Sequence, residues 1–211
     1  MKKVDLIIFD IDGTIVDSVK DISNAVNYAL RTMGLREKTE KQVKEAVGGG
    51  FETTLIKIFG ADRYSPEALE ALRYYYRKYP AVYSSLYRDV RYVLDYFSEK
   101  KKAVVTNKEY DITVEILESL KIAGEFDIIL GGNSISRKPD PRAIEYAVKT
   151  LKADFRKSII VGDMDIDIIA GKSAGIMTCA VAYGFGKLQD IVRQKPDFVI
   201  DKLADLTKIV Y

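Results

Sequence analysis

The chain has 211 residues, of which 47% are hydrophobic and 30% are charged, and its formal net charge is +2. This composition is typical of a globular protein, and the near-neutral charge gives no overall attraction to nucleic acid. No histidine is present, which excludes Ser-His-Asp and Cys-His catalysis and zinc sites with histidine ligands. The single cysteine, Cys179, excludes a disulfide framework, so the chemistry must come from carboxylates, lysines, hydroxyls, backbone amides or a bound cofactor.

The apolar segments are too short for targeting or membrane insertion. The first, Leu6 to Phe9, is shorter than the roughly 7–15 residues of a signal peptide, and no run reaches the roughly 18 residues of a membrane span. We therefore expect a cytoplasmic protein, either a monomer or a homodimer, with no nucleic-acid and no membrane partner.

The first predicted elements are one strand and a series of helices. Val4 to Phe9 is a short, β-rich apolar run that stops at a turn, Asp12-Gly13, which is typical of a buried strand. Helical spacing of apolar residues, together with helix starts at Thr39 and Ser65, then predicts four helices at about 22–33, 39–47, 51–59 and 66–79.

After Asp89, helices and strands alternate. Helices are expected near 90–99, 112–120, 141–151 and 166–174 and at the C-terminus, and strands at 103–106, 126–130, 158–161, 178–181 and 197–200. This alternation is typical of βαβ units in a parallel sheet. We predict an α/β fold, a three-layer sandwich around a parallel sheet. Residues 1–14 and 88–211 form its core domain, and residues 15–87 form an inserted α-helical cap domain.

Polar residues follow four of the predicted strands at the point where each strand ends. They are Asp10, Asp12, Gly13 and Thr14 after the first strand, Thr106, Asn107 and Lys108 after the second, Lys138 after the third, and Asp163 and Asp167 after the fourth. Ligands of open parallel sheets bind beyond the carboxyl ends of the strands, so we expect these residues to meet at one edge of the sheet.

These residue types suit phosphoryl chemistry at a divalent metal. Clustered carboxylates repel one another, and Mg²⁺ relieves this repulsion while binding one or two carboxylates, water and substrate phosphate. The expected groups are the carboxylates of Asp10 and Asp163, the hydroxyl of Thr106, the ammonium of Lys138, and backbone amides around Gly13 and Asn107. Phosphoryl transfer needs positioning and charge neutralisation more than a strong base, which fits a site without histidine.

Asp10 and Asp12 leave the end of the first strand on the same side, because side chains two residues apart share a face. One carboxylate can attack phosphorus and form an aspartyl-phosphate. The other, held off the metal, can protonate the leaving oxygen and later deprotonate the attacking water.

At these residues the chain resembles the haloacid dehalogenase-like phosphohydrolases. Four segments carry the resemblance in order: Phe9 to Thr14 (FDIDGT), Thr106 to Lys108 (TNK), Lys138-Pro139, and Gly162 to Asp167 (GDMDID). The resemblance implies Asp10 as nucleophile and Asp12 as general acid and base, with Thr106 and Lys138 as further catalytic residues. It also implies Mg²⁺ held by Asp10, the backbone carbonyl of Asp12, and Asp163, with Asp167 in a supporting role.

Within this superfamily the chain is most similar to phosphoglycolate phosphatases, through the TNK segment and the Gly48 to Gly50 loop. The resemblance implies a phosphatase acting on a small phosphorylated metabolite, with 2-phosphoglycolate as the lead candidate. A pyrophosphatase, a nucleotidase or a sugar-phosphate phosphatase or mutase is the alternative, although the mutase cap carries a histidine that this chain lacks. A signalling module that keeps its phosphoryl group is a more distant alternative, because Asp12 would promote hydrolysis.

Two features of the sequence, Lys108 and the Gly48 to Gly50 loop, are each open to two interpretations. Lys108 is either a contact to the phosphate site or a surface charge. The glycine loop is either only a helix stop or a cap loop that brings Gly49 close to the substrate.

Overall fold

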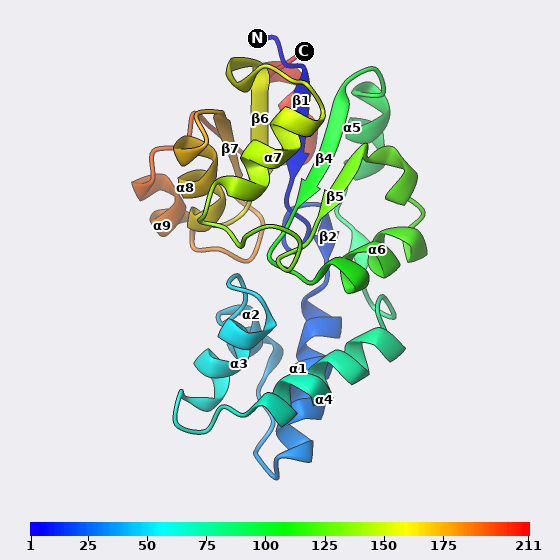
Figure 1. Ribbon diagram of the computed structural model, residues 1–211, viewed down its shortest axis with the longest axis vertical. Coiled ribbons are helices and arrows are strands. Elements are labelled where there is room, and N and C mark those ends of the chain that lie inside the picture. Colours follow the sequence, from blue (N-terminus) through cyan, green and yellow to red (C-terminus); the bar gives the residue numbers. More distant parts are fainter.

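The computed structural model describes residues 1–211 and has a sheet of six parallel strands at its centre (Figure 1). The strands are β1 (Leu6–Phe9), β4 (Lys101–Val105), β5 (Ile128–Leu130), β6 (Ser158–Gly162), β7 (Met177–Val181) and β8 (Phe198–Ile200), in the spatial order β5-β4-β1-β6-β7-β8. β1 pairs with both β4 and β6, which places Phe9 beside Val104 and Val161. The first predicted strand is thus a central strand of the sheet.

Helices cover both faces of this sheet. Leu6 and Ile8 pack on the side of α7 (Arg142–Thr150) and α8 (Asp165–Ser173), whereas Ile7 and Phe9 pack on the side of α5 (Val90–Tyr96), α6 (Tyr110–Ser119) and α10 (Leu206–Ile209). Each fully buried side chain of this kind contributes about 1.5–3 kcal/mol relative to exposure. The predicted α/β three-layer sandwich is confirmed, and its apolar strands are explained by burial on both faces.

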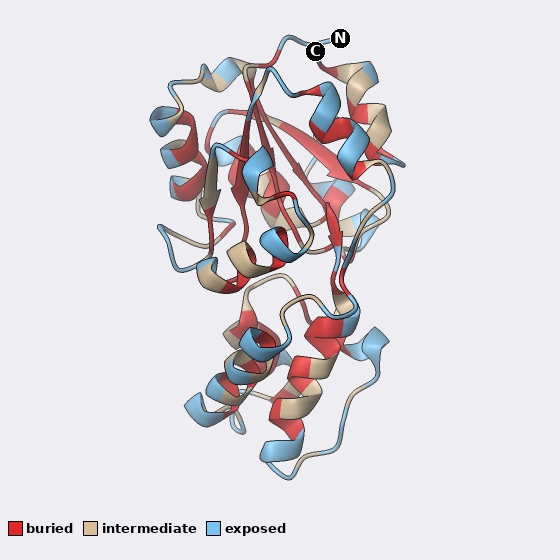
Figure 2. Cartoon of the chain, turned by 90° about the vertical axis from the view of Figure 1, so that its right-hand side faces the viewer, coloured by how far each residue is buried: buried red, intermediate tan, exposed pale blue.

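Four further helices form a separate lobe below the carboxyl ends of the strands (Figures 1 and 2). They are α1 (Val19–Thr32), α2 (Glu40–Lys44), α3 (Phe51–Phe59) and α4 (Pro66–Lys78). Their starts follow the expected chemistry: Thr39 and Gln42 form a capping box, and Ser65 accepts a hydrogen bond from the amide of Ala68. Buried faces of α1 and α4 pack against each other, and the apolar interior of the lobe is continuous with the apolar layer on the α5 and α6 side of the sheet.

Two very short strands join the lobe to the sheet, and the sequence pattern did not predict them. β2 (Val16–Asp17) and β3 (Ser85–Leu86) pair antiparallel. Next to them, the buried carboxylate of Asp21 accepts hydrogen bonds from the amides of Tyr83 and Ser84. The outgoing and returning chain are therefore held together where they cross between the two parts.

The other differences are also short elements. Helix α9 (Leu188–Arg193) was not predicted, and it packs on α8 through Ile191. Six residues are too few to show a helical period. None of the helices combines the length and apolar character that crossing a bilayer requires.

Candidate active site

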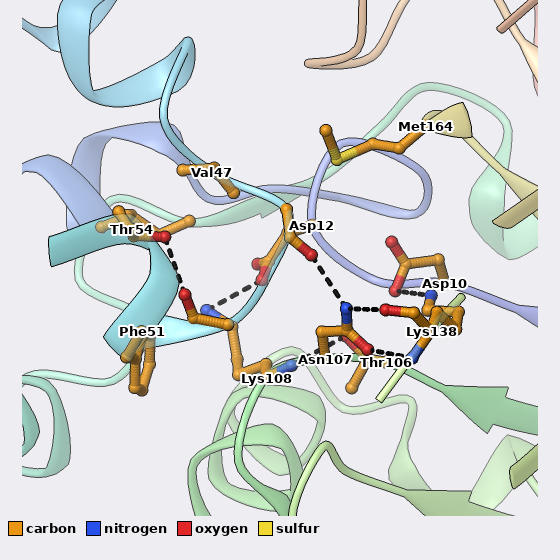
Figure 3. Close-up of a pocket in the computed structure, with 13 residues that line it drawn as sticks. Asp10, Asp12, Val47, Phe51, Thr54, Thr106, Asn107, Lys108, Lys138 and Met164 are labelled. Atoms are coloured by element: carbon orange, nitrogen blue, oxygen red, sulfur yellow. Dashed lines mark hydrogen bonds and ion pairs between the residues drawn. The ribbon is translucent and has the colours of Figure 1, made fainter. Parts of the chain in front are cut away.

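A pocket lies between the carboxyl edge of the sheet and the helical lobe (Figure 3). Its wall comprises Asp10, Asp12, Ile22, Val47, Gly48, Gly50, Phe51, Thr54, Thr106, Asn107, Lys108, Lys138 and Met164. Six of the predicted site residues are among them. Gly13, Gly49, Asp163 and Asp167 are not on this wall, and the structure places each of them differently.

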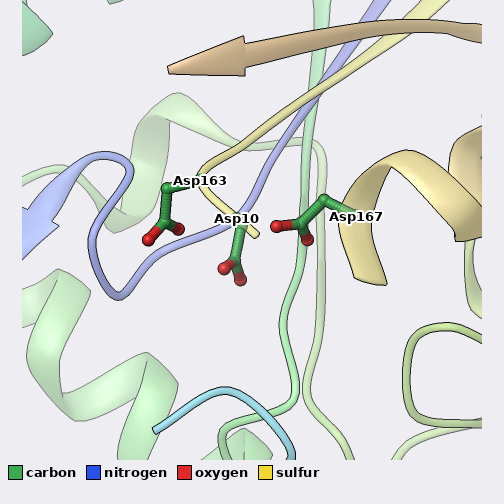
Figure 4. Close-up of side chains that lie close together, drawn as sticks. All are labelled: Asp10, Asp163 and Asp167. Atoms are coloured by element: carbon green, nitrogen blue, oxygen red, sulfur yellow. The ribbon is translucent and has the colours of Figure 1, made fainter. Parts of the chain in front are cut away.

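Three buried carboxylates meet at the floor of the site (Figure 4). Asp10 follows β1, Asp163 follows β6, and Asp167 lies in the first turn of α8; one oxygen of each lies within 4.8 Å of the others. The oxygens of Asp163 accept hydrogen bonds from the Thr14 hydroxyl at 2.8 Å and from the Phe185 amide at 2.7 Å. The strand ends thus bring Asp10 next to two acids that lie more than 150 residues later in the chain.

Gly13 supports this cluster from behind. Its backbone has a φ of +84°, and a Cβ atom there would lie 2.3 Å from Oδ2 of Asp163. Only glycine adopts this conformation easily and leaves space for the carboxylate. Gly13 therefore makes room for an acid of the cluster rather than lining the pocket.

Lys138 is the positive charge of the cluster. Its Nζ lies 2.8 Å from Oδ1 of Asp10 and 2.6 Å from Oδ1 of Asp167, and its side chain is 1% exposed. Burial alone would lower the pKa of Lys138, but the adjacent carboxylates outweigh it and raise that pKa above its ordinary value. The lysine is therefore held as a cation.

Asn107 holds the backbone of Lys138 in place. Its side-chain oxygen accepts a hydrogen bond from the Lys138 amide at 2.7 Å, and its Nδ2 donates to the Lys138 carbonyl at 2.9 Å. The same Nδ2 donates to the carbonyl of Gly48 in the lobe at 3.0 Å. Both polar atoms of the Asn107 side chain thus have partners within the protein. Its backbone amide is the group that remains available to bind a phosphate.

One lysine does not balance three buried carboxylates. Burial, and then repulsion by Asp10 and Asp167, raise the pKa of Asp163; burial, followed by the nearby Asp10, also raises the pKa of Asp167 despite its contact with Lys138. A dication with oxygen ligands would relieve this repulsion, and carboxylates are the ligands that Mg²⁺ prefers. The donor set therefore fits the expected metal.

Asp12 turns its carboxylate away from this cluster. The Ser18 hydroxyl donates a hydrogen bond to Oδ1 of Asp12, and Nζ of Lys108 lies 3.1 Å from Oδ2. Asp10 and Asp12 both line the pocket, but their side chains have different partners. The two carboxylates are thus held by different groups of the protein.

Lys108 is a pocket residue, so the alternative of a surface charge is wrong. Its side chain is 1% exposed, and its Nζ donates to the hydroxyl of Tyr76 at 2.9 Å. The ammonium also lies 4.3 Å from the ring centre of Tyr76 and 5.5 Å from that of Phe51, which are cation–π distances.

Thr106 lines the pocket as expected. Its hydroxyl accepts a hydrogen bond from the Lys108 amide at 3.3 Å, which leaves the hydroxyl proton free to be donated. This arrangement suits a contact to an oxygen of a phosphate group.

The glycine loop reaches the pocket, but through different glycines from the one expected. Gly48 and Gly50 line the pocket, whereas Gly49 faces Thr53 and lines an adjoining outer groove. The expectation that Gly49 contacts the substrate pocket is therefore corrected. The middle residue of the loop points outward because its neighbours approach the core, where a Cβ on Gly50 would lie 3.1 Å from the Asn107 carbonyl oxygen.

The lobe contributes pocket residues that the sequence did not reveal. Phe51 and Thr54 of α3 and Ile22 of α1 lie on the wall, and Tyr76 of α4 lies behind Lys108. Their apolar spacing indicated only that each helix has a buried face. No local signal distinguishes a residue that faces the pocket from one that faces the interior of the lobe.

Charged pairs also tie the lobe to the core. Arg73 on α4 donates from Nε to Glu109 at 2.8 Å, and Arg77, one turn later, donates to Asp111 at 3.0 Å. Both acids lie at the start of α6, directly after the Lys108 loop. The lobe is thus held against the core by polar contacts as well as by the residues of the pocket wall.

Comparisons with known proteins agree with this geometry. The haloacid dehalogenase-like hydrolase family matches residues 7–181. The phosphoglycolate phosphatase of Aquifex aeolicus is 37% identical, over 97% of this chain and 96% of that protein, and the phosphoglycolate phosphatase of Vibrio cholerae is 31% identical, over 100% and 98%.

Solved structures give the same result. The crystal structure of a predicted phosphoglycolate phosphatase from Haemophilus somnus has a TM-score of 0.92 and 29% identity, with 99% of both chains covered. A haloacid dehalogenase-like hydrolase from Streptococcus pneumoniae has a TM-score of 0.90 and 26% identity, with 98% of both covered. The chain therefore belongs to the haloacid dehalogenase-like hydrolases, in their phosphoglycolate phosphatase-like branch.

Proposed function

We propose that this phosphatase is Mg²⁺-dependent and hydrolyses a small phosphorylated metabolite, with 2-phosphoglycolate as the lead candidate, through an aspartyl-phosphate on Asp10. One observation carries the proposal. Asp10 lies in the buried acidic cluster, while Asp12, on the same pocket wall, is held outside that cluster by Ser18 and Lys108. This difference in surroundings supports Asp10 as the attacking acid and Asp12 as the acid that moves protons.

The metal-binding side would comprise Asp10, the backbone carbonyl of Asp12, and Asp163, with Asp167 holding Lys138 beside them. When bound, Mg²⁺ supplies positive charge that neutralises the oxygens of the transferred phosphoryl group. The raised pKa values of Asp163 and Asp167 support this assignment, because they report negative charge that the protein itself leaves unbalanced.

In the first step, an oxygen of Asp10 attacks phosphorus and the bond from phosphorus to the ester oxygen breaks. Asp12 gives a proton to the departing oxygen, which leaves as an alcohol. The Thr106 hydroxyl, the Lys138 ammonium and the backbone amide of Asn107 bind phosphate oxygens during this transfer.

In the second step, water attacks the phosphorus atom of the aspartyl-phosphate. Asp12 accepts the proton of the water, the bond between phosphorus and the Asp10 oxygen breaks, and its electron pair returns to the carboxylate. Inorganic phosphate leaves. Asp12 gives up a proton in the first step and takes one in the second, whereas Asp10 bonds to phosphorus in the first step and is released as a carboxylate in the second. This difference explains why Asp12 needs a position of its own.

The size of the pocket supports a small substrate. The unfilled cavity measures about 30 Å³, room for only one or a few water molecules. A phosphate ester is larger, so the lobe must move away from the core for binding and close again over the substrate. A small leaving group such as glycolate suits such a site, and the names of the relatives point to the same substrate.

The test is turnover of a panel of phosphate esters with and without Mg²⁺. The panel contains 2-phosphoglycolate, sugar phosphates, nucleotides and pyrophosphate. We expect Mg²⁺-dependent hydrolysis with the highest kcat/KM for 2-phosphoglycolate, and no turnover by Asp10→Asn. Hydrolysis by Asp10→Asn at the wild-type rate would remove the covalent mechanism, and a preference for another member of the panel would replace the substrate.

A further inference from the structure

Lys108 has a set of contacts that binding a phosphate group does not require. Its ammonium lies between Asp12, which belongs to the core, and two aromatic residues of the lobe, Tyr76 and Phe51. Figure 3 shows Lys108 with Asp12 and Phe51. The adjacent loop is anchored to the same helix as Tyr76, because Glu109 binds Arg73 three residues before Tyr76 on α4. The lysine thus connects the position of the lobe with the position of Asp12.

These contacts restrict the side chain of Lys108, which would otherwise be flexible. An exposed lysine moves freely about its four-carbon stem. Here the Tyr76 hydroxyl accepts one N–H of Lys108, Asp12 lies 3.1 Å away, and ring faces cover the ammonium. The side chain is 1% exposed, so water does not compete for these contacts. The position of Nζ is therefore determined by the lobe.

Asp12 in turn has both of its oxygens occupied. Ser18 donates to Oδ1, and Lys108 faces Oδ2. Removing Lys108 would leave one hydrogen bond and allow the carboxylate to rotate. Ser18 is buried at the start of α1, so it remains as a single anchor.

From these contacts we propose that Lys108 is a positioning residue: the closed lobe clamps it, and it orients the carboxylate of Asp12 for proton transfer. The proposal rests on the covalent mechanism above. It concerns mainly the second step, in which water attacks phosphorus, its proton passes to Asp12, and the electron pair of the breaking bond returns to Asp10. With a substrate whose leaving group needs no proton, the aspartyl-phosphate forms without Lys108 but is hydrolysed slowly.

The experiment follows both steps with 4-nitrophenyl phosphate, whose leaving group departs without needing a proton. Rapid mixing measures the release of 4-nitrophenolate, and acid quenching measures the amount and decay of phosphorylated protein. For Lys108→Met we expect 4-nitrophenolate release in the first turnover to be little changed. We expect decay of the phosphorylated protein to be about 10- to 100-fold slower, as for a misplaced catalytic group.

Two further variants keep the test independent of folding. Tyr76→Phe removes the hydroxyl that binds Lys108 but keeps the ring that packs on Phe51, so we expect a smaller slowing of the same step. Lys102→Met is the matched control, because Lys102 is also a buried lysine but donates to the Phe97 carbonyl, away from the pocket. We expect wild-type kinetics from this control.

Several results would overturn the proposal. Decay at the wild-type rate in both Lys108→Met and Tyr76→Phe would show that Lys108 does not orient Asp12. A rise in KM confined to esters that carry a carboxylate, with unchanged decay, would show that Lys108 contacts substrate instead. If wild-type protein hydrolyses no ester, or Asp10→Asn remains active, the proposed function fails, and that outcome is distinct from both of these.

Discussion

Replacing Lys138 by methionine tests the charge balance of the acidic cluster. Removing one partner of a buried ion pair costs about 3–5 kcal/mol, because the remaining charges stay buried without compensation. Lys138 contacts Asp10 and Asp167 at 2.8 and 2.6 Å, and all three side chains are buried. A chain of this length loses about 2–4 °C in Tm per kcal/mol. We therefore expect Tm of metal-free Lys138→Met to fall by about 6–20 °C.

Thermal unfolding followed by circular dichroism measures this loss in EDTA and again in excess Mg²⁺. The cation should raise Tm more in Lys138→Met than in the wild type, since it would then provide the only positive charge among the carboxylates. Lys102→Met is the control: it loses a hydrogen bond to the Phe97 carbonyl, which costs about 0.5–1.5 kcal/mol, and a 3.9 Å ion pair with the exposed carboxylate of Glu125, which is worth about 0–1 kcal/mol.

Two outcomes would refute this reasoning. If Lys138→Met and Lys102→Met lose the same stability, the cost arises from burying a different side chain and not from charge. If Mg²⁺ stabilises Lys138→Met no more than the wild type, the lysine and the cation do not share the task of neutralising the cluster.

Two other predictions concern the metal-binding side. In metal-free protein the pKa of Asp163 is raised to about 8 and that of Asp167 to about 6, so the folded chain binds these protons more tightly than the unfolded chain does. Their stabilising contribution is complete below about pH 4, the ordinary carboxyl range, and is lost as the pH rises through 6 and 8. Urea unfolding in EDTA at several pH values should show this loss as a fall in the free energy of unfolding, and Asp163→Asn or excess Mg²⁺ should make the fall smaller. If neither changes the slope of the free energy of unfolding against pH, Asp163 is not the group that titrates. Separately, Gly13→Ala should weaken the Mg²⁺-dependent rise in Tm, since its Cβ would lie 2.3 Å from an Asp163 oxygen. Gly34→Ala, at a φ of +68° with no atom within 4 Å, carries only the backbone strain and should leave that rise intact.

The sheet and the floor of the site could be predicted from the sequence for physical reasons. Strands buried on both faces read as short apolar runs, and their alternation with helices indicates a parallel arrangement. Polar residues such as Asp10 and Lys138 directly follow such runs or the loops after them, so the sheet edge brings them together. Helix α3 could be delimited at Phe51 and Phe59 because glycines flank it on both sides.

The part of the site that the helical lobe contributes could not be predicted in the same way. Tyr76 has the spacing of a buried helical residue, and that spacing is identical whether the ring packs inside the lobe or against Lys108. The orientation of Gly49 depends on how the lobe sits on the core, which no local pattern encodes. The β2–β3 ribbon has two residues in each strand, too few to show alternation.

The hydrogen bonds of the Asn107 side chain would respond differently if the lobe moved away from the core. Its link to the Gly48 carbonyl crosses between them, but its two links to the backbone of Lys138 lie within the sheet-bearing half. If the lobe opens for product release, one of these three hydrogen bonds would break, and the Lys138 ammonium would stay beside Asp10 and Asp167. The acidic floor would then stay assembled from one turnover to the next, and only the part of the site that the lobe contributes would have to be rebuilt around each new substrate molecule.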